Sequence, residues 1–357
     1  MKRKKRNPEK FDPVELFTAM GRNFDYKLDA EGDIRDFLDR VGNSLKASIS
    51  NPAMLHGKRV ETMFAHVAGA LGRCRLIKQE DAGAVFVNGG DLEIPDYRLV
   101  LTDGTALLVE VKNFRSKDYR KGFAIRADYL SKLEAYAALN GLPLKLAVYF
   151  PNPNTWVLLS RQSFTADGDI FRVNFVEAIA RNEMALLGDR MIATLHDLRI
   201  DFLADPAECS TPDANGEVQF TVREIRMSCA GKGVTDEAGK NIAFYLMRYG
   251  EWVEQENTAI FQDGKVVGMR FTYAPMEPVE EQGPHIAGTL SNMVSNAYKE
   301  LTVQSGAVVA LDVKHDPDVF SLGIPEGYKG SLPLWQFILQ PNYDLRARGI
   351  EREEQEA

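Results

Sequence analysis

The sequence predicts an α/β fold, with a mixed β-sheet flanked by helices, followed by a smaller α+β domain. The first observation behind this prediction is the order of hydrophobic patterns over residues 57–150, which runs helix, several strands, helix, strand. The second is residues 201–217, whose Asp, Pro, Ala and Gly content is typical of a linker. The third is the length of 357 residues, which suffices for two domains with separate cores.

The part before the linker divides into a helical lead-in at residues 1–50 and a domain at residues 51–200. After the break at Asn51-Pro52, apolar residues at helical spacing predict a helix over 57–71. Alternating or continuous apolar runs predict strands, and the helix between the last two would carry the chain back over the sheet. The expected strands are 75–79, 84–87, 97–101, 106–114 and 144–150, the crossing helix is 126–140, and a strand at 155–160 and a helix at 175–187 follow.

The part after the linker, residues 218–357, has a mixed pattern. It predicts a helix at 236–249, a hairpin through Asp263-Gly264, an acidic loop at 275–284, a helix at 288–301 and a strand at 307–313. A helix followed by a hairpin is consistent with a winged-helix unit, and equally with an oligomerisation or partner-binding domain.

Composition limits the classes of function. Apolar residues make up 45% and charged residues 26%, which is typical of a folded protein. The net charge of −8 argues against a protein that coats nucleic acid by bulk electrostatics, although a local basic rim can still bind phosphate. No stretch approaches the roughly 18 apolar residues that a membrane helix needs. The three cysteines lack the spacing of a zinc site or disulfide framework, so we expect a cytoplasmic protein.

Chemistry is concentrated in residues 94–112, which form two expected strands around Asp103-Gly104. Residues two apart in a strand share a face, so Glu110 and Lys112 point the same way. Two hairpin registers are open for Asp96. A two-residue turn pairs position 96 with 111 and separates Asp96 from Glu110. A three-residue loop, 102–104, with Gly104 left-handed, pairs 96 with 110 and gathers the three side chains, and we predict this register.

Two carboxylates that converge from neighbouring strands repel each other unless a cation lies between them. Hard oxygen ligands suit Mg²⁺ or Mn²⁺, and the Val111 carbonyl is a candidate further ligand beside Asp96 and Glu110. Such a cation can lower the pKa of water and offset phosphoryl charge, while Lys112 can orient the water or stabilise the transition state. The acidic residues Glu80, Asp81, Asp91 and Glu93 nearby are interpreted mainly as loop charges, with Glu93 as a substitute ligand.

These residues resemble the PD-(D/E)XK nuclease superfamily, through Pro95-Asp96 and Glu110-Val111-Lys112, over about residues 57–160. The resemblance implies a restriction-endonuclease-like fold and metal-dependent hydrolysis of DNA, in bacterial restriction, phage defence or repair. It also implies that an acidic residue on the helix before the sheet completes the metal site. Glu61 fits that position.

The expected helix 126–140 is similar to the Gln-x-x-x-Tyr motif of the RecB-like branch, with Lys132 in place of Gln and Tyr136 matching. The resemblance implies that Lys132 contacts phosphate or the catalytic water and that Tyr136 lies at the nucleic acid. A basic stretch before this helix is suited to phosphate contacts. Its members are Arg115, Lys117, Arg120, Lys121 and Arg126.

Two alternatives to a DNA nuclease stay open: the same chemistry on RNA, and a non-catalytic nucleic-acid-binding or scaffold protein. The complete Asp, Glu and Lys set argues against the scaffold. The expected partner is nucleic acid, DNA before RNA, without a membrane. The C-terminal domain would select the target, bind a partner protein or form a homo-oligomer.

Overall fold

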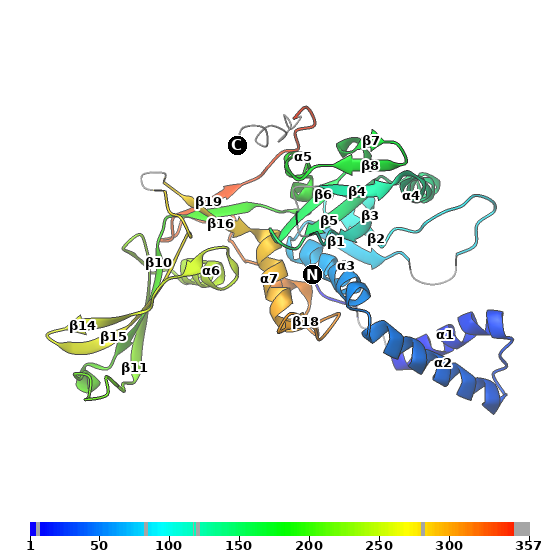
Figure 1. The fold of residues 1–357 in the computed structure, drawn as a ribbon. Helices are drawn as coiled ribbons and strands as arrows, with labels where there is room; N and C mark the ends of the chain where they lie inside the picture. The colour runs from blue at the N-terminus through cyan, green and yellow to red at the C-terminus, as the bar shows by residue number, and fades with distance from the viewer. Residues whose placement is uncertain (5–7, 82–84, 117, 119–121, 280–282, 346–357) are drawn as a thin grey trace, which may run out of the picture. The chain divides into compact units, whose positions relative to one another are not determined.

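The computed structural model describes residues 1–4, 8–81, 85–116, 118, 122–279 and 283–345. Contacts between residues divide the chain into two compact units (Figure 1). The first unit comprises residues 1–187, 298–320 and 340–357, and the second comprises 188–297 and 321–339. Among the described residues, no helix has the length and apolar character that crossing a membrane requires.

This division lies elsewhere than the linker predicted at 201–217. Residues 198–204 form a strand that pairs with two others of the second unit, so the chain has already left the first unit before residue 201. Residues 298–320 return to the first unit because Thr302 and Asp312 bond to Arg59 and His66, which are buried there. The composition of residues 201–217 predicted a linker, but contacts between residues far apart in the sequence decide where the two units divide.

The first unit is built on a five-stranded mixed sheet in the order β1-β2-β3-β5-β6. β3 and β5 are parallel, and the other neighbouring pairs are antiparallel. Helix α4 lies between β3 and β5 in the chain and makes the crossover that a parallel pair requires. The predicted α/β fold class, a mixed sheet flanked by helices, is therefore confirmed. The strands are β1 (Cys74–Gln79), β2 (Tyr97–Leu101), β3 (Ala106–Asn113), β5 (Leu144–Phe150) and β6 (Thr155–Leu159).

The helices of the first unit begin and end at local signals. For α3, the Asn51 side chain accepts a hydrogen bond from the Met54 N–H and Pro52 occupies the first helical position. α4 ends at Gly141, whose φ of +63° suits glycine. The helices are α1 (Pro8–Phe24), α2 (Glu31–Ile49), α3 (Pro52–Ala70), α4 (Ala127–Asn140) and α5 (Phe175–Ala180).

A buried apolar cluster joins α4 and α5 to the central sheet and to a second small sheet. Leu130 of α4 packs with Leu146 and Val148 of β5, and all three are fully buried. The second sheet has the order β4-β8-β7, with β4 (Phe123–Arg126), β7 (Thr165–Asp167) and β8 (Ile170–Val173). The returning segment adds β17 (Val303–Gln304) and β18 (Ala307–Val308).

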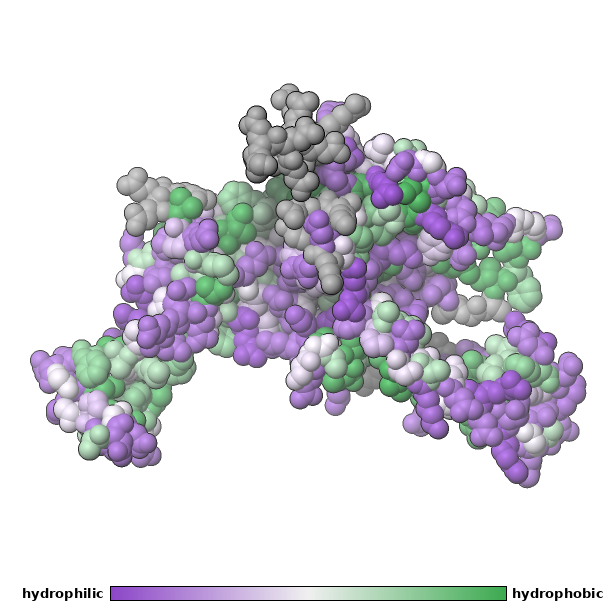
Figure 2. Space-filling view, in the orientation of Figure 1, coloured by the Kyte–Doolittle hydropathy of each residue, from purple (hydrophilic) through white to green (hydrophobic). Residues whose placement is uncertain are grey.

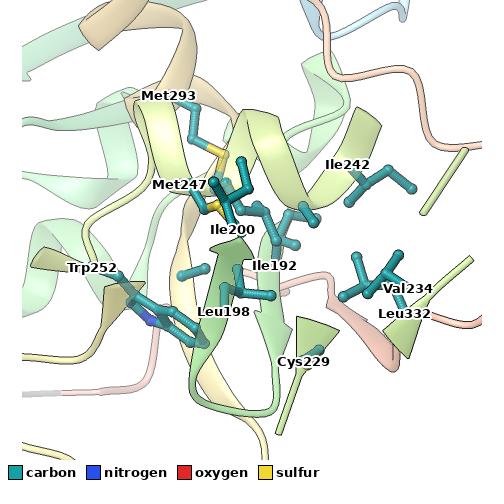
Figure 3. Close-up of a cluster of buried hydrophobic side chains, with 13 residues drawn as sticks. Ile192, Leu198, Ile200, Cys229, Val234, Ile242, Met247, Trp252, Met293 and Leu332 are labelled. Atoms are coloured by element: carbon teal, nitrogen blue, oxygen red, sulfur yellow. The ribbon is translucent and has the colours of Figure 1, made fainter. Parts of the chain in front are cut away.

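The second unit has its own core between helix α6 and a larger antiparallel sheet (Figure 3). Figure 3 shows Met247 of α6 beside Ile200 of the sheet and Ile242 of α6 above Val234 and Leu332, with Trp252 near Leu198. The unit also holds a three-stranded sheet in the order β16-β9-β19. Its elements are β9 (Met191–Thr194), β10 (Leu198–Ala204), β11 (Val222–Cys229), β12 (Lys232–Val234), α6 (Glu237–Tyr249), β13 (Val253–Glu254), β14 (Thr258–Gln262), β15 (Lys265–Ala274), β16 (His285–Thr289) and β19 (Leu334–Phe337). Helix α7 (Leu290–Thr302) contains the point of division.

The predicted hairpin through Asp263-Gly264 is confirmed, because β14 and β15 pair around it. Its surface is partly apolar: Ile225, Phe261 and Met269 are exposed, and Figure 2 shows hydrophobic residues over this part of the chain. The sheet face that is apolar at the core therefore continues beyond it.

Three predicted elements are corrected. Residues 85–87 form no strand, because they pair with no neighbour and Phe86 is 91% exposed; residue 84 lies outside the described residues. The helix expected at 175–187 is interrupted after Ala180, and the strand expected at 307–313 is β18 alone. An apolar run was enough to predict a strand, but a strand forms only where a neighbouring strand pairs with it.

Candidate functional site

The β2–β3 hairpin has the register that brings Asp96 opposite Glu110. Tyr97 pairs with Val109 and Val100 with Ala106, so one further step along the ladder places 96 beside 110. Residues 102–104 form the loop between the strands, and the Leu101 N–H donates to the Thr105 carbonyl at 2.8 Å. Gly104 has a φ of +91°, the left-handed conformation that the loop requires. The predicted three-residue loop is confirmed.

Asp96 immediately precedes β2, and a hydrogen bond from the neighbouring strand β3 holds its side chain. Its Oδ2 accepts a hydrogen bond from the Val111 N–H at 2.7 Å. Burial raises the pKa of the Asp96 carboxyl above its ordinary range, and the negative charges of Glu110 and Glu61 raise it further, against the effect of the Val111 N–H and Lys112. The site therefore concentrates negative charge that the protein itself does not fully offset.

Asp96 belongs to a set of three acidic residues that we call the acidic triplet: Glu61, Asp81 and Asp96. One carboxylate oxygen from each lies within 4.8 Å of the others. Glu61 comes from α3, as predicted, and Asp81 follows the end of β1. The Glu80 N–H donates to the Asp96 carbonyl at 2.8 Å, and this backbone bond places Asp81 beside the site. Sequence reasoning interpreted Asp81 as a loop charge.

Glu110 does not belong to the acidic triplet, although the sequence predicted it as a metal ligand beside Asp96. Its Oε1 instead accepts hydrogen bonds from Lys112 Nζ at 2.5 Å and from the Tyr129 hydroxyl at 2.6 Å. Glu110 is buried and Lys112 half-buried, on the face of β3 covered by α4. Glu110 and Lys112 are thus side by side as expected, and Tyr129 is a residue that the sequence did not indicate.

The two residues of the RecB-like motif bond to other partners than this pair. Lys132 Nζ forms an ion pair with Asp91 at 2.6 Å, and the Tyr136 hydroxyl donates to Glu80 Oε1 at 2.9 Å. Both side chains therefore tie α4 to the segment before β2. The Lys132 ammonium has an exposed loop carboxylate as its partner, and its contact with phosphate or the catalytic water stays a prediction.

Of the predicted basic stretch, Arg115 is exposed and Arg126 pairs with Asp128 at 2.7 Å. Lys117, Arg120 and Lys121 lie outside the described residues. The ion pair of Arg126 is exposed on both sides, so it costs little to exchange it for a phosphate contact.

The donor set fits a hard divalent cation. All three members of the acidic triplet offer carboxylate oxygen, which is the ligand that Mg²⁺ and Mn²⁺ prefer. The raised pKa of Asp96 shows that the site would gain from added positive charge. Glu61 also bonds to Lys58 at 2.8 Å, an exposed lysine that offsets part of the charge. Val111 contributes its N–H to Asp96, and its carbonyl as a ligand stays a prediction.

Comparisons with known proteins add little. No protein-family model and no curated protein matches the chain. Among solved structures, the chain is similar to Hjc, a Holliday junction resolvase of Archaeoglobus fulgidus, with 20% sequence identity over 37% of this chain and 96% of that one. The TM-score is 0.26, which is too low for this likeness to carry function across.

Proposed function

We propose that the protein is a metal-dependent nuclease that hydrolyses DNA phosphodiester bonds. The observation that carries the proposal is the convergence of Glu61, Asp81 and Asp96 within 4.8 Å, beside the Glu110–Lys112 pair. Three separate segments of the chain supply these carboxylates, and Asp96 is held in place by the Val111 N–H. Asp96 and Glu61 are half-buried and Asp81 is exposed, and like charges brought this close repel one another unless a cation offsets them.

Each side chain has a role in the proposed reaction. The acidic triplet would hold the cation, which when bound supplies charge stabilisation at the phosphoryl oxygens and lowers the pKa of a water molecule. Lys112 carries a positive charge on the same face as Glu110 and can stabilise the pentacovalent transition state. Hydrolysis forms a bond from water oxygen to phosphorus and breaks one ester P–O bond. The water proton passes to a base or to solvent, and the departing sugar oxygen takes up a proton from solvent and leaves as a hydroxyl.

The resemblance to the PD-(D/E)XK superfamily supports this reaction class through the residues Asp96, Glu110 and Lys112. DNA as the substrate, Mg²⁺ or Mn²⁺ as the cofactor, and a place in restriction, phage defence or repair all belong to the proposal. The second unit would select the target or partner.

The test is a cleavage assay on the purified full chain with Mg²⁺, Mn²⁺ or EDTA, using supercoiled DNA, single-stranded DNA and RNA. We expect metal-dependent cleavage of DNA that Asp96→Ala and Lys112→Ala each lower by about 10³-fold. Asp236→Asn, which changes a helix cap in the second unit, serves as the control and should retain activity. If no substrate is cut, or if both site variants cut as well as wild type, the proposal fails. Cleavage of RNA alone would select the RNA alternative.

A further inference from the structure

Tyr129 lies in the first turn of α4, where the packing of the helix fixes its position. The next residue, Leu130, and Leu133 one turn later are fully buried against the sheet. Tyr129 itself is half-buried and packs against the same apolar cluster. The backbone that carries its phenol ring is therefore anchored by residues other than Tyr129.

The Tyr129 hydroxyl bonds to both members of the Glu110–Lys112 pair. It donates to Glu110 Oε1 at 2.6 Å and accepts from Lys112 Nζ at 3.2 Å. Lys112 Nζ also lies 4.7 Å from the centre of the Tyr129 ring, within the range of a cation–π contact. We call these three residues the Glu110 cluster. Its hydrogen bonds form a closed triangle, because Lys112 Nζ also donates to Glu110 Oε1.

We propose that Tyr129 is a positioning residue for the nuclease reaction, holding the Glu110 carboxylate and the Lys112 ammonium in one fixed arrangement. The inference rests on the proposed function. A lysine side chain has several rotatable bonds, and its charge is useful in a transition state only when it is held at one place. Tyr129 supplies the third contact that limits both side chains, and it keeps Glu110 Oε1 directed toward Lys112.

The chain contains a matched cluster away from the acidic triplet, which provides a control. The Tyr343 hydroxyl donates to Glu183 Oε1 at 2.6 Å, and Lys145 Nζ donates to Glu183 Oε2 at 2.5 Å. We call Glu183, Lys145 and Tyr343 the Glu183 cluster. It has the same three residue types, and its glutamate likewise accepts from a tyrosine and a lysine, while Ser160 also bonds to Glu183 and Lys145. Removing the hydroxyl in each cluster therefore removes a tyrosine–glutamate hydrogen bond at two different places.

The first measurement compares Tyr129→Phe with Tyr343→Phe in the full chain, using the substrate and metal that wild type cleaves best. Tyr129→Phe should lower kcat by about 10- to 100-fold, the size of effect expected when hydrogen bonds to charged groups are lost, with KM within about threefold. Tyr343→Phe should leave kcat within about threefold. The melting temperature of Tyr129→Phe should fall no more than that of Tyr343→Phe.

The second measurement does not depend on catalysis. Acylation of Lys112 by a water-soluble N-hydroxysuccinimide ester, followed by peptide mass spectrometry, reports how firmly the ammonium is held. We expect the Lys112 rate to rise at least severalfold in Tyr129→Phe and to be unchanged in Tyr343→Phe.

The outcomes separate this inference from the nuclease proposal. A lower kcat with faster Lys112 labelling in Tyr129→Phe supports it. If wild type is active and Tyr129→Phe has the same kcat, the inference is overturned, whatever the labelling rate. If Tyr343→Phe loses as much kcat as Tyr129→Phe, the loss reflects general stability and the inference is also overturned. If wild type cuts nothing, the nuclease proposal fails and the role of Tyr129 falls with it, while altered labelling would still establish the contact.

Discussion

The Glu110 cluster and the Glu183 cluster share their residue types but differ in what surrounds the glutamate. Around Glu183, burial raises the pKa, but hydrogen bonds from Lys145, Ser160 and Tyr343 outweigh burial and lower it overall. Beside the Glu110 cluster lies Asp96, whose pKa is raised by burial first and then by the neighbouring carboxylates Glu110 and Glu61. Satisfied carboxylates stabilise a fold, whereas crowded ones store repulsion that a ligand can relieve. This difference supports our proposal that the Glu110 cluster is functional and the Glu183 cluster structural.

The largest expected effect concerns Asp81, the member of the acidic triplet that the sequence did not indicate. Asp81→Asn should lower metal-dependent cleavage by about 10³-fold, because the cation would lose one of its carboxylates. Asp91→Asn is the matched control, since Asp91 lies in the same segment but bonds to Lys132 and should leave the rate within about threefold. Steady-state rates of both variants decide the matter. Equal rates for Asp81→Asn and wild type would remove Asp81 from the site.

The acidic triplet and the Glu183 cluster should respond oppositely to loss of a carboxylate charge. Glu183→Gln breaks a buried ion pair and should lower the free energy of unfolding by about 3 kcal/mol. Asp96→Asn keeps an acceptor for the Val111 N–H while removing repulsion, and should raise it by about 1 kcal/mol in the absence of metal. Urea unfolding with EDTA at pH 7.5 measures both. If Asp96→Asn were less stable than wild type, repulsion between Asp96 and the neighbouring carboxylates would not be what destabilises the wild-type site.

Metal binding should stabilise the protein through the acidic triplet, and this stabilisation should not depend on the Glu183 cluster. A cation at ten times its dissociation constant should raise the free energy of unfolding of wild type by about 1.4 kcal/mol. The increment should vanish in Asp96→Asn and persist in Glu183→Gln. Thermal unfolding across a Mn²⁺ titration measures it, and an increment that survives in Asp96→Asn would place the cation elsewhere.

The smallest effect is the acid dependence of the Glu183 cluster. The folded-state pKa of Glu183 is below its ordinary value of 4.5, so the stabilisation is fully present above about pH 4.5 and is lost as pH falls through the folded pKa. The difference in melting temperature between wild type and Glu183→Gln should therefore shrink between pH 6 and pH 3.5. A constant difference would show that the charge of Glu183 is not what matters.

Local rules were sufficient to predict much of the first unit. Strand alternation and the loop before Thr105 gave the register of Asp96 and Glu110, since both depend on neighbouring residues. The position of Asp81 depends instead on a backbone hydrogen bond between Glu80 and Asp96, which lie in different segments of the chain. A hydrophobic pattern within one segment does not predict such a contact.

The helix α4 shows the same limit. Its apolar spacing placed the helix correctly, but the rotation of the helix decided which polar residue reaches the site. Tyr129, next to the buried Leu130, contacts Glu110, whereas Lys132 is directed to Asp91. Local sequence patterns could not predict the division into units either. The segment 298–320 returns to α3 through contacts between residues that are more than 240 positions apart in the sequence.

The interleaving of the two units restricts how the protein can be dissected. A chain that stops at residue 187 would leave Arg59 without Thr302, His66 without Asp312 and Glu183 without Tyr343. Gly69 would lose the close approach of Pro317, whose Cβ leaves no room for a side chain there. A fragment that keeps the first unit whole therefore cannot be made by truncation and requires excision of 188–297 and 321–339, with each pair of ends rejoined.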